Sequence, residues 1–261
     1  MAFINVKRRD GTHTSCSGAA LTPEWILTTA FCIWNVSPNK VKVHIGITDI
    51  KRKNEDRAVQ TMRASKVFRH DDFCFYTVCN YTHMGYDIGL ILLQNPFRET
   101  DECKVGKLPD NEIKYRKARV IAIGFMPTKL WNLTLLQEME TNVFDANDED
   151  KCRTVERDPI CIFEPSVDII IGNSGSPLIH EGLVIGIASH ALVDGTGTVH
   201  MVYENTYAYK NWITNKMQKD TDYEKSIGNS TATNLRLQLH SSLSLPILPI
   251  VFDLFHFLRV L

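Results

Sequence analysis

One serine in this 261-residue chain lies in a setting suited to nucleophilic chemistry. Ser174 stands between glycines in the run Gly172-Asn-Ser-Gly-Ser-Pro177. A serine hydroxyl attacks a carbonyl efficiently only when a base removes its proton, a carboxylate holds that base and amides bind the oxyanion. The rest of the sequence must therefore provide a base, a carboxylate and the fold that brings them to Ser174.

Cysteine content and glycosylation triplets indicate an oxidising, extracellular setting. Seven cysteines are many for a cytosolic protein of this length. None of them forms a C-x-x-C pair, so we expect no metal site. Four acceptor triplets for N-glycosylation begin at Asn35, Asn80, Asn132 and Asn229. We predict a secreted glycoprotein with disulfide bonds.

Composition narrows the class of partner. The formal net charge is −1, which gives no reason to expect nucleic acid or an anionic membrane as a partner. Hydrophobic residues make up 44% of the chain, enough for a large core in a single domain. Protein or peptide partners are therefore expected, and the sequence implies no metal or organic cofactor.

Short runs rich in β-forming residues, separated by turn residues, must position the chemistry. Their spacing is typical of an all-β sandwich or barrel. Expected strands are Ala2–Lys7, Trp25–Phe31, Val41–Ile47, Ile88–Leu93, Val120–Phe125, Leu135–Val143, Leu183–Ala188 and His200–Thr206. One helix is expected at Tyr207–Lys219, with apolar residues spaced for a buried face.

The end of the chain differs in composition. Lys225–Thr233 is polar, and Ser241–Leu261 is strongly apolar but interrupted by prolines. Asp253 and Arg259 lie inside the apolar run, and each would cost roughly 2.5–3.5 kcal/mol at the centre of a membrane. Membrane attachment through this tail is not expected, although small residues at Gly228–Ser230 leave a lipid-anchor signal as an alternative.

Three separated motifs resemble those of the trypsin/chymotrypsin family, in the family's order. Ser17–Cys32 is similar to Gly-Gly-x-Leu…Trp-Val-Leu-Thr-Ala-Ala-His-Cys, and Tyr86–Leu93 to Asn-Asp-Ile-x-Leu-Leu-x-Leu. Gly172–Leu178 is similar to Gly-Asp-Ser-Gly-Gly-Pro-Leu. The resemblance implies two packed antiparallel β-barrels with a cleft between them, followed by a C-terminal helix and an atypical apolar tail.

This resemblance also sets the expected domain boundaries. It covers Ala2 to Met217, which implies a protease-like domain over residues 1–220 and a linker and tail over 221–261. The sequence starts close to Cys16, so we expect the leader and the activation segment to be absent from it.

The resemblance also assigns most cysteines. Cys16–Cys32 and Cys152–Cys161 match disulfide bridges of the family. A local bridge between Cys74 and Cys79 is expected in what looks like an inserted loop. Cys103 then remains as the odd cysteine.

Transferred residue by residue, the family's triad is incomplete in this chain. Ser174 matches the nucleophile and Asp87 the orienting carboxylate, but Phe31 stands at the position of the base. Phenylalanine cannot accept a proton, and loss of the histidine in a related triad costs about 10⁶ in kcat, roughly 8 kcal/mol. His190, beside Ser189, is the best candidate for a substitute base.

The oxyanion hole and the specificity pocket of the family's site are also altered. The amides of Gly172 and Ser174 match the oxyanion hole, but neutral Asn173 replaces the aspartate whose ion pair orders it.

The residues matching the specificity pocket are Asp168, Ser189, Ala191 and Met201. Asp168 stands where trypsin-like enzymes bind a basic side chain, or is an ordinary surface aspartate. Ala191 and Met201 replace wall glycines, so the pocket is expected to be filled.

The sequence therefore predicts a non-catalytic serine protease homologue that acts as a binding or regulatory module. The alternative is an active serine endopeptidase that uses Ser174 with a substitute base.

Overall fold

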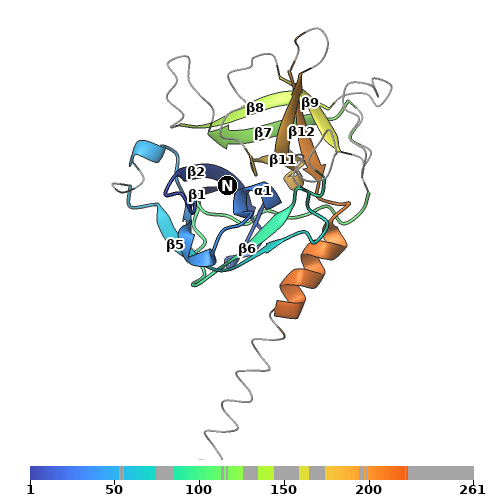
Figure 1. Cartoon of the computed structure of the whole chain (residues 1–261). Helices are drawn as coiled ribbons and strands as arrows, with labels where there is room; N and C mark the ends of the chain where they lie inside the picture. The colour runs from blue at the N-terminus through green and yellow to red at the C-terminus, as the bar shows by residue number, and fades with distance from the viewer. Residues whose placement is uncertain are drawn as a thin grey trace, which may run out of the picture. The chain divides into compact units, whose positions relative to one another are not determined.

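Figure 1 shows the protein as a computed structural model. It describes residues 1–52, 54, 56–74, 85–112, 115, 117–125, 135–143, 159–164, 174–193, 197, 199–220 and 222. Met1–Thr214 form one compact unit, and a second unit begins at Asn215. The description below concerns the first unit unless stated otherwise.

Six antiparallel strands close into a barrel in the order β1-β2-β3-β6-β5-β4. They are β1 (Ala2–Lys7), β2 (His13–Ala20), β3 (Trp25–Thr28), β4 (Val41–Ile45), β5 (Gln60–Arg69) and β6 (Gly89–Leu93). Inward-facing residues such as Ile4, Val43 and Ile91 are fully buried and form the barrel core. Closure leaves no strand of this barrel with an unpaired edge.

The second half of the unit is a six-stranded sheet in the order β8-β7-β10-β11-β12-β9. Its strands are β7 (Arg119–Phe125), β8 (Leu136–Asn142), β9 (Ile160–Glu164), β10 (Pro177–His180), β11 (Leu183–Val193) and β12 (Val199–Asn205). The sheet curls until a single bridge joins Val143, just after β8, to Ile162 of β9. It is thus a half-barrel, where a second closed barrel was expected. The prediction of an all-β fold is confirmed.

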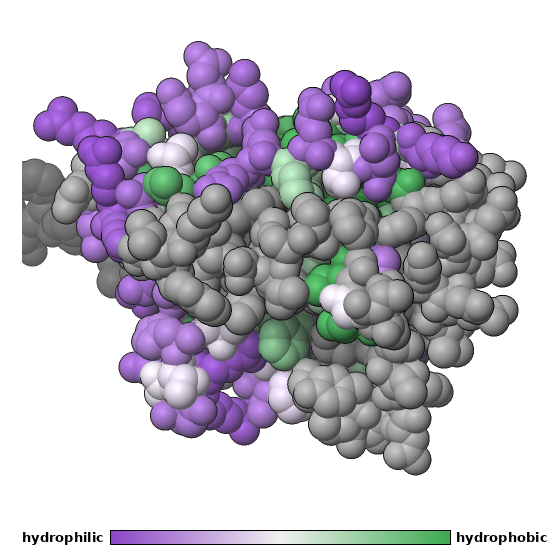
Figure 2. Space-filling view, turned by 90° about the horizontal axis from the view of Figure 1, so that it is seen from above, coloured by the Kyte–Doolittle hydropathy of each residue, from purple (hydrophilic) through white to green (hydrophobic). Residues whose placement is uncertain are grey.

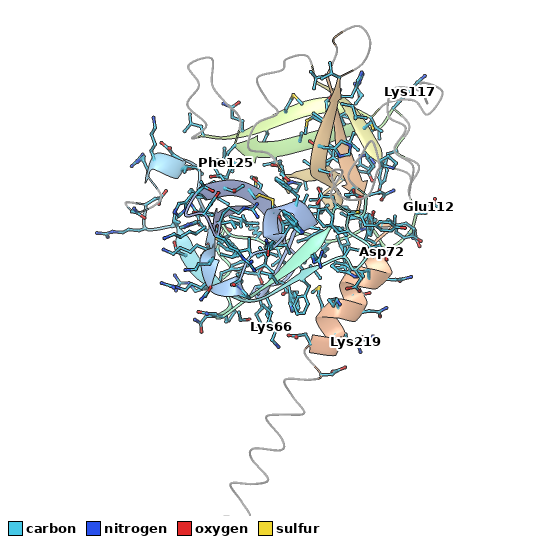
Figure 3. All side chains as sticks on the ribbon, viewed as in Figure 1. Lys66, Asp72, Glu112, Lys117, Phe125 and Lys219 are labelled. Carbon is cyan, nitrogen blue, oxygen red and sulfur yellow. A yellow bond between two sulfur atoms is a disulfide. The ribbon has the colours of Figure 1, made fainter. Side chains whose placement is uncertain are left out.

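Aromatic residues join the barrel to the half-barrel. Phe125, at the end of β7 and labelled in Figure 3, meets Phe3 of β1 edge to face, with 5.3 Å between ring centroids. Ile47 completes this small buried cluster. Such a pair adds about 0.5–1.5 kcal/mol beyond its buried area, so the contact fixes β7 against the first strand.

The structure corrects several predicted elements. The predicted strand Trp25–Phe31 ends at Thr28, and Ala30–Ile33 form a short helix, α1. The reason is local, because the Thr29 side chain caps this helix by accepting a hydrogen bond from the Cys32 amide. The sequence does not predict β2 and β5, which carry few uninterrupted apolar runs, or β9 and β10, which are only 5 and 4 residues long.

The expected C-terminal helix is present over residues 210–220, and Ile213 is buried on its inner face. Among the described residues, no helix is long and apolar enough to cross a membrane. The apolar tail lies outside the described residues. In the view of Figure 2, the described surface is mainly hydrophilic, with hydrophobic residues visible only in small areas.

Candidate functional site

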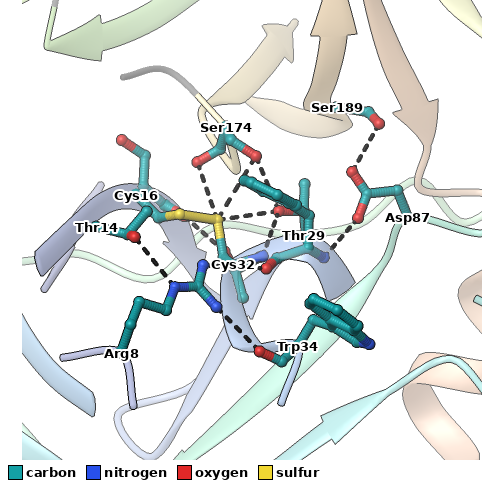
Figure 4. Close-up of a disulfide and its surroundings, with 12 residues drawn as sticks. Arg8, Thr14, Cys16, Thr29, Cys32, Trp34, Asp87, Ser174 and Ser189 are labelled. Atoms are coloured by element: carbon teal, nitrogen blue, oxygen red, sulfur yellow. Dashed lines mark hydrogen bonds between the residues drawn. A yellow bond between two sulfur atoms is a disulfide. The ribbon is translucent and has the colours of Figure 1, made fainter. Parts of the chain in front are cut away.

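A disulfide anchors the segment that carries Phe31. It joins Cys16 of β2 to Cys32 of α1, the pair expected from the sequence, with 6.1 Å between their Cα atoms. Figure 4 shows α1 lying between this disulfide and Asp87. The main-chain position of Phe31 is therefore fixed from the barrel side.

Asp87 lies between the barrel and the half-barrel, with no exposed surface. Its Oδ1 accepts a hydrogen bond from the Phe31 amide, and its Oδ2 accepts one from the Ser189 hydroxyl, each at 2.7 Å (Figure 4). Burial raises the pKa of this carboxyl to about 6, although both hydrogen bonds act in the opposite direction. The carboxylate thus binds a backbone amide and a hydroxyl, and its interaction with Phe31 runs through the main chain.

Glu204 of β12 supports Asp87 from the half-barrel. Its Oε1 accepts a hydrogen bond from the Asp87 amide at 3.2 Å, and its Oε2 accepts one from the Tyr209 hydroxyl at 2.7 Å. No sequence pattern pointed to this glutamate, because it reaches Asp87 across 117 residues.

The Ser174 hydroxyl lies against α1. Its Oγ is 3.0 Å from the Thr29 Oγ1 and 3.5 Å from the Cys32 Sγ (Figure 4). That sulfur is in a disulfide and has no proton to donate, so it can only be a weak acceptor. The Ser174 carbonyl accepts a hydrogen bond from the Ser17 amide at 2.8 Å, which ties the serine to β2.

Arg8, from the connection after β1, covers the other side of Phe31. Its Cζ lies 5.7 Å from the centre of the Phe31 ring, within the range of a cation–π contact. Its guanidinium also donates to the carbonyls of Phe31 and Trp34, at 3.4 and 2.9 Å. Sequence reasoning missed Arg8, because it is 23 residues from Phe31 and lies in no family motif.

Ser189 and His190 extend the hydrogen bonds of Asp87 along β11. The Ser189 Oγ, which donates to Asp87, lies 3.1 Å from the His190 Nδ1. When Asp87 is ionised, the single hydroxyl proton of Ser189 is used, so His190 must donate from Nδ1. Ser189, expected in the specificity pocket, therefore has its hydroxyl on the carboxylate. With that carboxylate ionised and the imidazole neutral, the proton of His190 lies on Nδ1 and Nε2 has the lone pair.

The other residues matched to the pocket belong to the half-barrel core. Met201 pairs in register with Ala191 across β11 and β12. Its side chain is only 4% exposed and packs in a cluster with Ile162 and Ala188. Ala191 packs against that cluster from its edge.

Several predicted site residues lie outside the described residues: Asp168, Gly172, Asn173, Cys79 and Cys152. Cys74 and Cys161 are each in a disulfide, and Cys103 is a buried free thiol. In the described part of the chain, no group of three or more His, Cys, Asp or Glu side chains could hold a metal ion.

Comparison with known proteins agrees with this geometry. The trypsin family model matches residues 1–213. Granzyme-like protein 1 of Rattus norvegicus is 25% identical over 84% of this chain and 86% of its own length. The snake venom serine protease catroxase-1 of Crotalus atrox is 28% identical over 84% of this chain and 83% of its own.

Solved structures show the same fold. The scabies mite inactivated protease paralogue S-I1 superposes with a TM-score of 0.68 at 20% identity, covering 84% of this chain and 93% of that one. The paralogue S-D1 gives a TM-score of 0.66 at 19% identity, covering 83% and 91%. With the family model matched over most of its length, the chain belongs to the trypsin family of serine proteases.

Proposed function

We propose that this protein is a non-catalytic member of the trypsin family that acts as a protein-binding or regulatory module. The observation that carries the proposal is the bonding of Asp87. The carboxylate that would hold the catalytic histidine accepts hydrogen bonds from the Phe31 amide and from Ser189. The side chain at position 31 is a phenyl ring, which cannot take a proton from a serine.

The surroundings of Ser174 support the same function. Its hydroxyl neighbours are the Thr29 hydroxyl and a disulfide sulfur. Neither group is a base at neutral pH. An alcohol without a general base is a weak nucleophile, so acyl transfer from a peptide to Ser174 is expected to be negligible.

Side chains that fill the expected specificity pocket support a role other than cleavage after a large residue. Met201 and Ala191, which match glycines of the family's pocket walls, pack in or against the core cluster. Names of relatives such as catroxase-1 and mast cell protease 3 of Ovis aries describe venom and mast cell proteases. We therefore propose an extracellular protein whose partners are proteins or peptides.

A second function, serine endopeptidase activity with His190 as the base, is favoured by one observation. Asp87, Ser189 and His190 form a continuous hydrogen-bond chain, with distances of 2.7 and 3.1 Å. A histidine that donates from Nδ1 to a carboxylate-linked partner has the tautomer of a triad histidine. These hydrogen bonds would leave Nε2 of His190 unprotonated, as a general base requires.

Labelling with a fluorophosphonate, which reacts with activated serines, tests both functions. The wild-type protein, Ser174→Ala, Phe31→His, Phe31→Ala and His190→Ala are compared, with active trypsin as the positive control. We expect no labelling of the wild type. Labelling that is lost in both Ser174→Ala and His190→Ala would establish the endopeptidase instead.

The two substitutions at Phe31 separate chemistry from access. Phe31→His restores an imidazole beside Asp87, whereas Phe31→Ala only removes the ring. Labelling gained in Phe31→His and absent in Phe31→Ala would mean that the oxyanion site is intact and the base alone is missing. Absence of labelling in every variant would mean that the site is disabled at several positions.

A further inference from the structure

The small net charge of this protein hides a strong asymmetry along the chain. Residues 1–70 contain 12 lysines and arginines against 5 acidic residues. The remaining residues contain 17 against 25. The first part, which forms β1 to β5 of the barrel, therefore has an excess of positive charge that the total of −1 conceals.

Four of the six barrel strands carry basic residues or histidine and no acidic residue. Strands β1, β2, β4 and β5 contain no aspartate or glutamate. Their lysines and arginines are Lys7, Lys42, Arg63, Lys66 and Arg69. Figure 1 shows β1, β2 and β5 on the barrel wall, and the strand order places β4 between β1 and β5.

Strand register brings four cations together on the outside of this wall. Lys42 of β4 lies directly opposite Arg63 of β5 on one side and Asn5 of β1 on the other. Lys7 ends β1 and Lys40 directly precedes β4, so both lie just beyond the last pair of this register, Val6 with Val41. We call Lys7, Lys40, Lys42 and Arg63 the basic face, and all four are exposed.

The basic face is not neutralised from within the described part of the chain. The ion pairs found there involve other residues: His70, Lys104, Arg119 and Lys210. Asp10 and Glu24 are the acidic residues among positions 1–48, and the Asp10 carboxylate binds Thr12. Because like charges about 5 Å apart across two strands repel, Lys42 and Arg63 weaken the barrel unless an anion lies over them.

We propose that the basic face binds a sulfated polysaccharide. Neighbouring strands are about 4.8 Å apart and alternate residues of a strand about 7 Å apart, so the cations form an open grid on the outer wall of the barrel. A grid of this kind suits an extended chain of repeating anions. The exposed large hydrophobics of the described residues, Trp34, Leu135 and Val193, lie outside β1, β4 and β5, so nothing on these strands would insert into a lipid surface.

This inference deepens the proposed function, because it names a partner class for a binding module, but its test is independent of catalysis. The full chain is applied to immobilised heparin, and the dissociation constant is measured at salt concentrations from about 50 to about 200 mM NaCl. Four ionic contacts predict a slope of about −3 for the logarithm of affinity against that of salt, hence about 60-fold weaker binding at the higher concentration. The same binding is expected of Ser174→Ala.

The decisive variant is Lys42→Glu, and Lys51→Glu is its matched control. Lys51 lies in a 3-10 helix, Ile50–Arg52, beyond the other end of β4, and the change in net charge is the same. We expect Lys42→Glu to bind heparin about tenfold more weakly, while its Tm rises because the introduced carboxylate would face Arg63. Lys51→Glu should bind like the wild type.

A fall in affinity together with a rise in Tm cannot come from unfolding, so this pair of results would establish the site. Equal affinities for Lys42→Glu and Lys51→Glu would overturn the proposal. Failure of the wild type to bind heparin, with retention on phosphatidylserine vesicles or on an acidic peptide, would also overturn it. Fluorophosphonate labelling, measured separately, decides the proposed loss of catalysis whatever the heparin result.

Discussion

The barrel and the half-barrel solve the same packing problem in different ways. The barrel pairs all six of its strands on both sides and fills its interior with aliphatic residues and cysteines. The half-barrel leaves β8 and β9 as edges that meet at one bridge, and its core includes tyrosines. The barrel provides Thr29, Phe31 and Asp87, and the half-barrel side provides Ser174 and Ser189. The candidate site therefore lies between a closed barrel on one side and a more open sheet on the other.

The largest expected effect on stability comes from Gly175, in the turn where the half-barrel side contacts the barrel. Gly175 has a φ of +86°, and a Cβ there would collide with the Ser17 carbonyl oxygen and lie 2.6 Å from the Thr28 Oγ1. Both partners belong to the barrel. We expect Gly175→Ala to lower the free energy of unfolding by about 4 kcal/mol or more, because backbone strain and a backbone clash add together.

The matched control for this change is Gly182→Ala. Gly182 has a similar φ of +78°, but its Cβ would meet nothing within 4 Å. This control isolates the strain and should cost about 1 kcal/mol. Equal losses in urea denaturation of the two variants would show that the contact between barrel and half-barrel at Ser17 is not tight.

The second prediction concerns the pH dependence of the buried carboxylate between the halves. The pKa of Asp87 is raised to about 6 in the folded protein, above its ordinary value of 3.8. Between these two values the folded state holds a proton that the unfolded state has lost. Stability due to this group therefore falls as pH rises through the window, by about 3 kcal/mol in total.

Urea denaturation of the wild type and Asp87→Asn, at several pH values from about 4 to about 7, measures this contribution. Asparagine does not titrate, so the stability difference between the two proteins should change in favour of Asp87→Asn as the pH rises. A constant difference across that range would mean that Asp87 is solvated more than its position indicates.

Sequence reasoning succeeded in the barrel where strands are mostly apolar. The predicted strand Ala2–Lys7 has the observed bounds, and the prediction Ile88–Leu93 is one residue too long. Prediction failed at β5, since the exposed outer wall of a barrel gives every second position to polar residues. It failed at β2 because His13–Ala20 consists of small and polar residues, although its last five residues are buried. The β5 sequence, with exposed Thr61, Arg63 and Ser65, has too weak an apolar pattern to separate from a loop.

At the site, motifs indicated which residues matter, but contacts between distant segments could not be predicted. Family resemblance predicted that Ser174, Asp87 and Phe31 lie at one site. It could not reveal that the hydroxyl of Ser189 bonds to Asp87, or that Arg8 lies over Phe31. These contacts depend on how the turn after β1 packs on α1 and how β11 packs on the segment before β6, which no local pattern encodes.

The third prediction tests the more open core of the half-barrel. Burial raises the pKa of Tyr115 to about 12, and its hydroxyl is buried without a hydrogen-bond partner among the described residues. Its ring lies edge to face with His180, at 5.9 Å between centroids. Tyr115→Phe keeps the ring and removes the buried hydroxyl, so we expect the free energy of unfolding to rise by about 1 kcal/mol. A loss of stability in thermal unfolding would show that the hydroxyl has a partner, such as an ordered water.

The smallest expected effect lies on the outer wall of the barrel, where charge rather than packing is out of balance. Lys42 faces Arg63 directly, so Lys42→Gln removes a repulsion and keeps a long, polar side chain. We expect a gain of about 0.5 kcal/mol at low salt, shrinking toward zero at about 1 M NaCl, where the Debye length is only about 3 Å. Lys51→Gln, on the 3-10 helix beyond β4, should show neither the gain nor its salt dependence. If Lys42→Gln gains nothing at low salt, Lys42 and Arg63 point apart and do not act as one cationic unit. In that case the barrel wall would differ from the half-barrel in closure and packing alone, and its positive charge would have no common site at which to hold an anion.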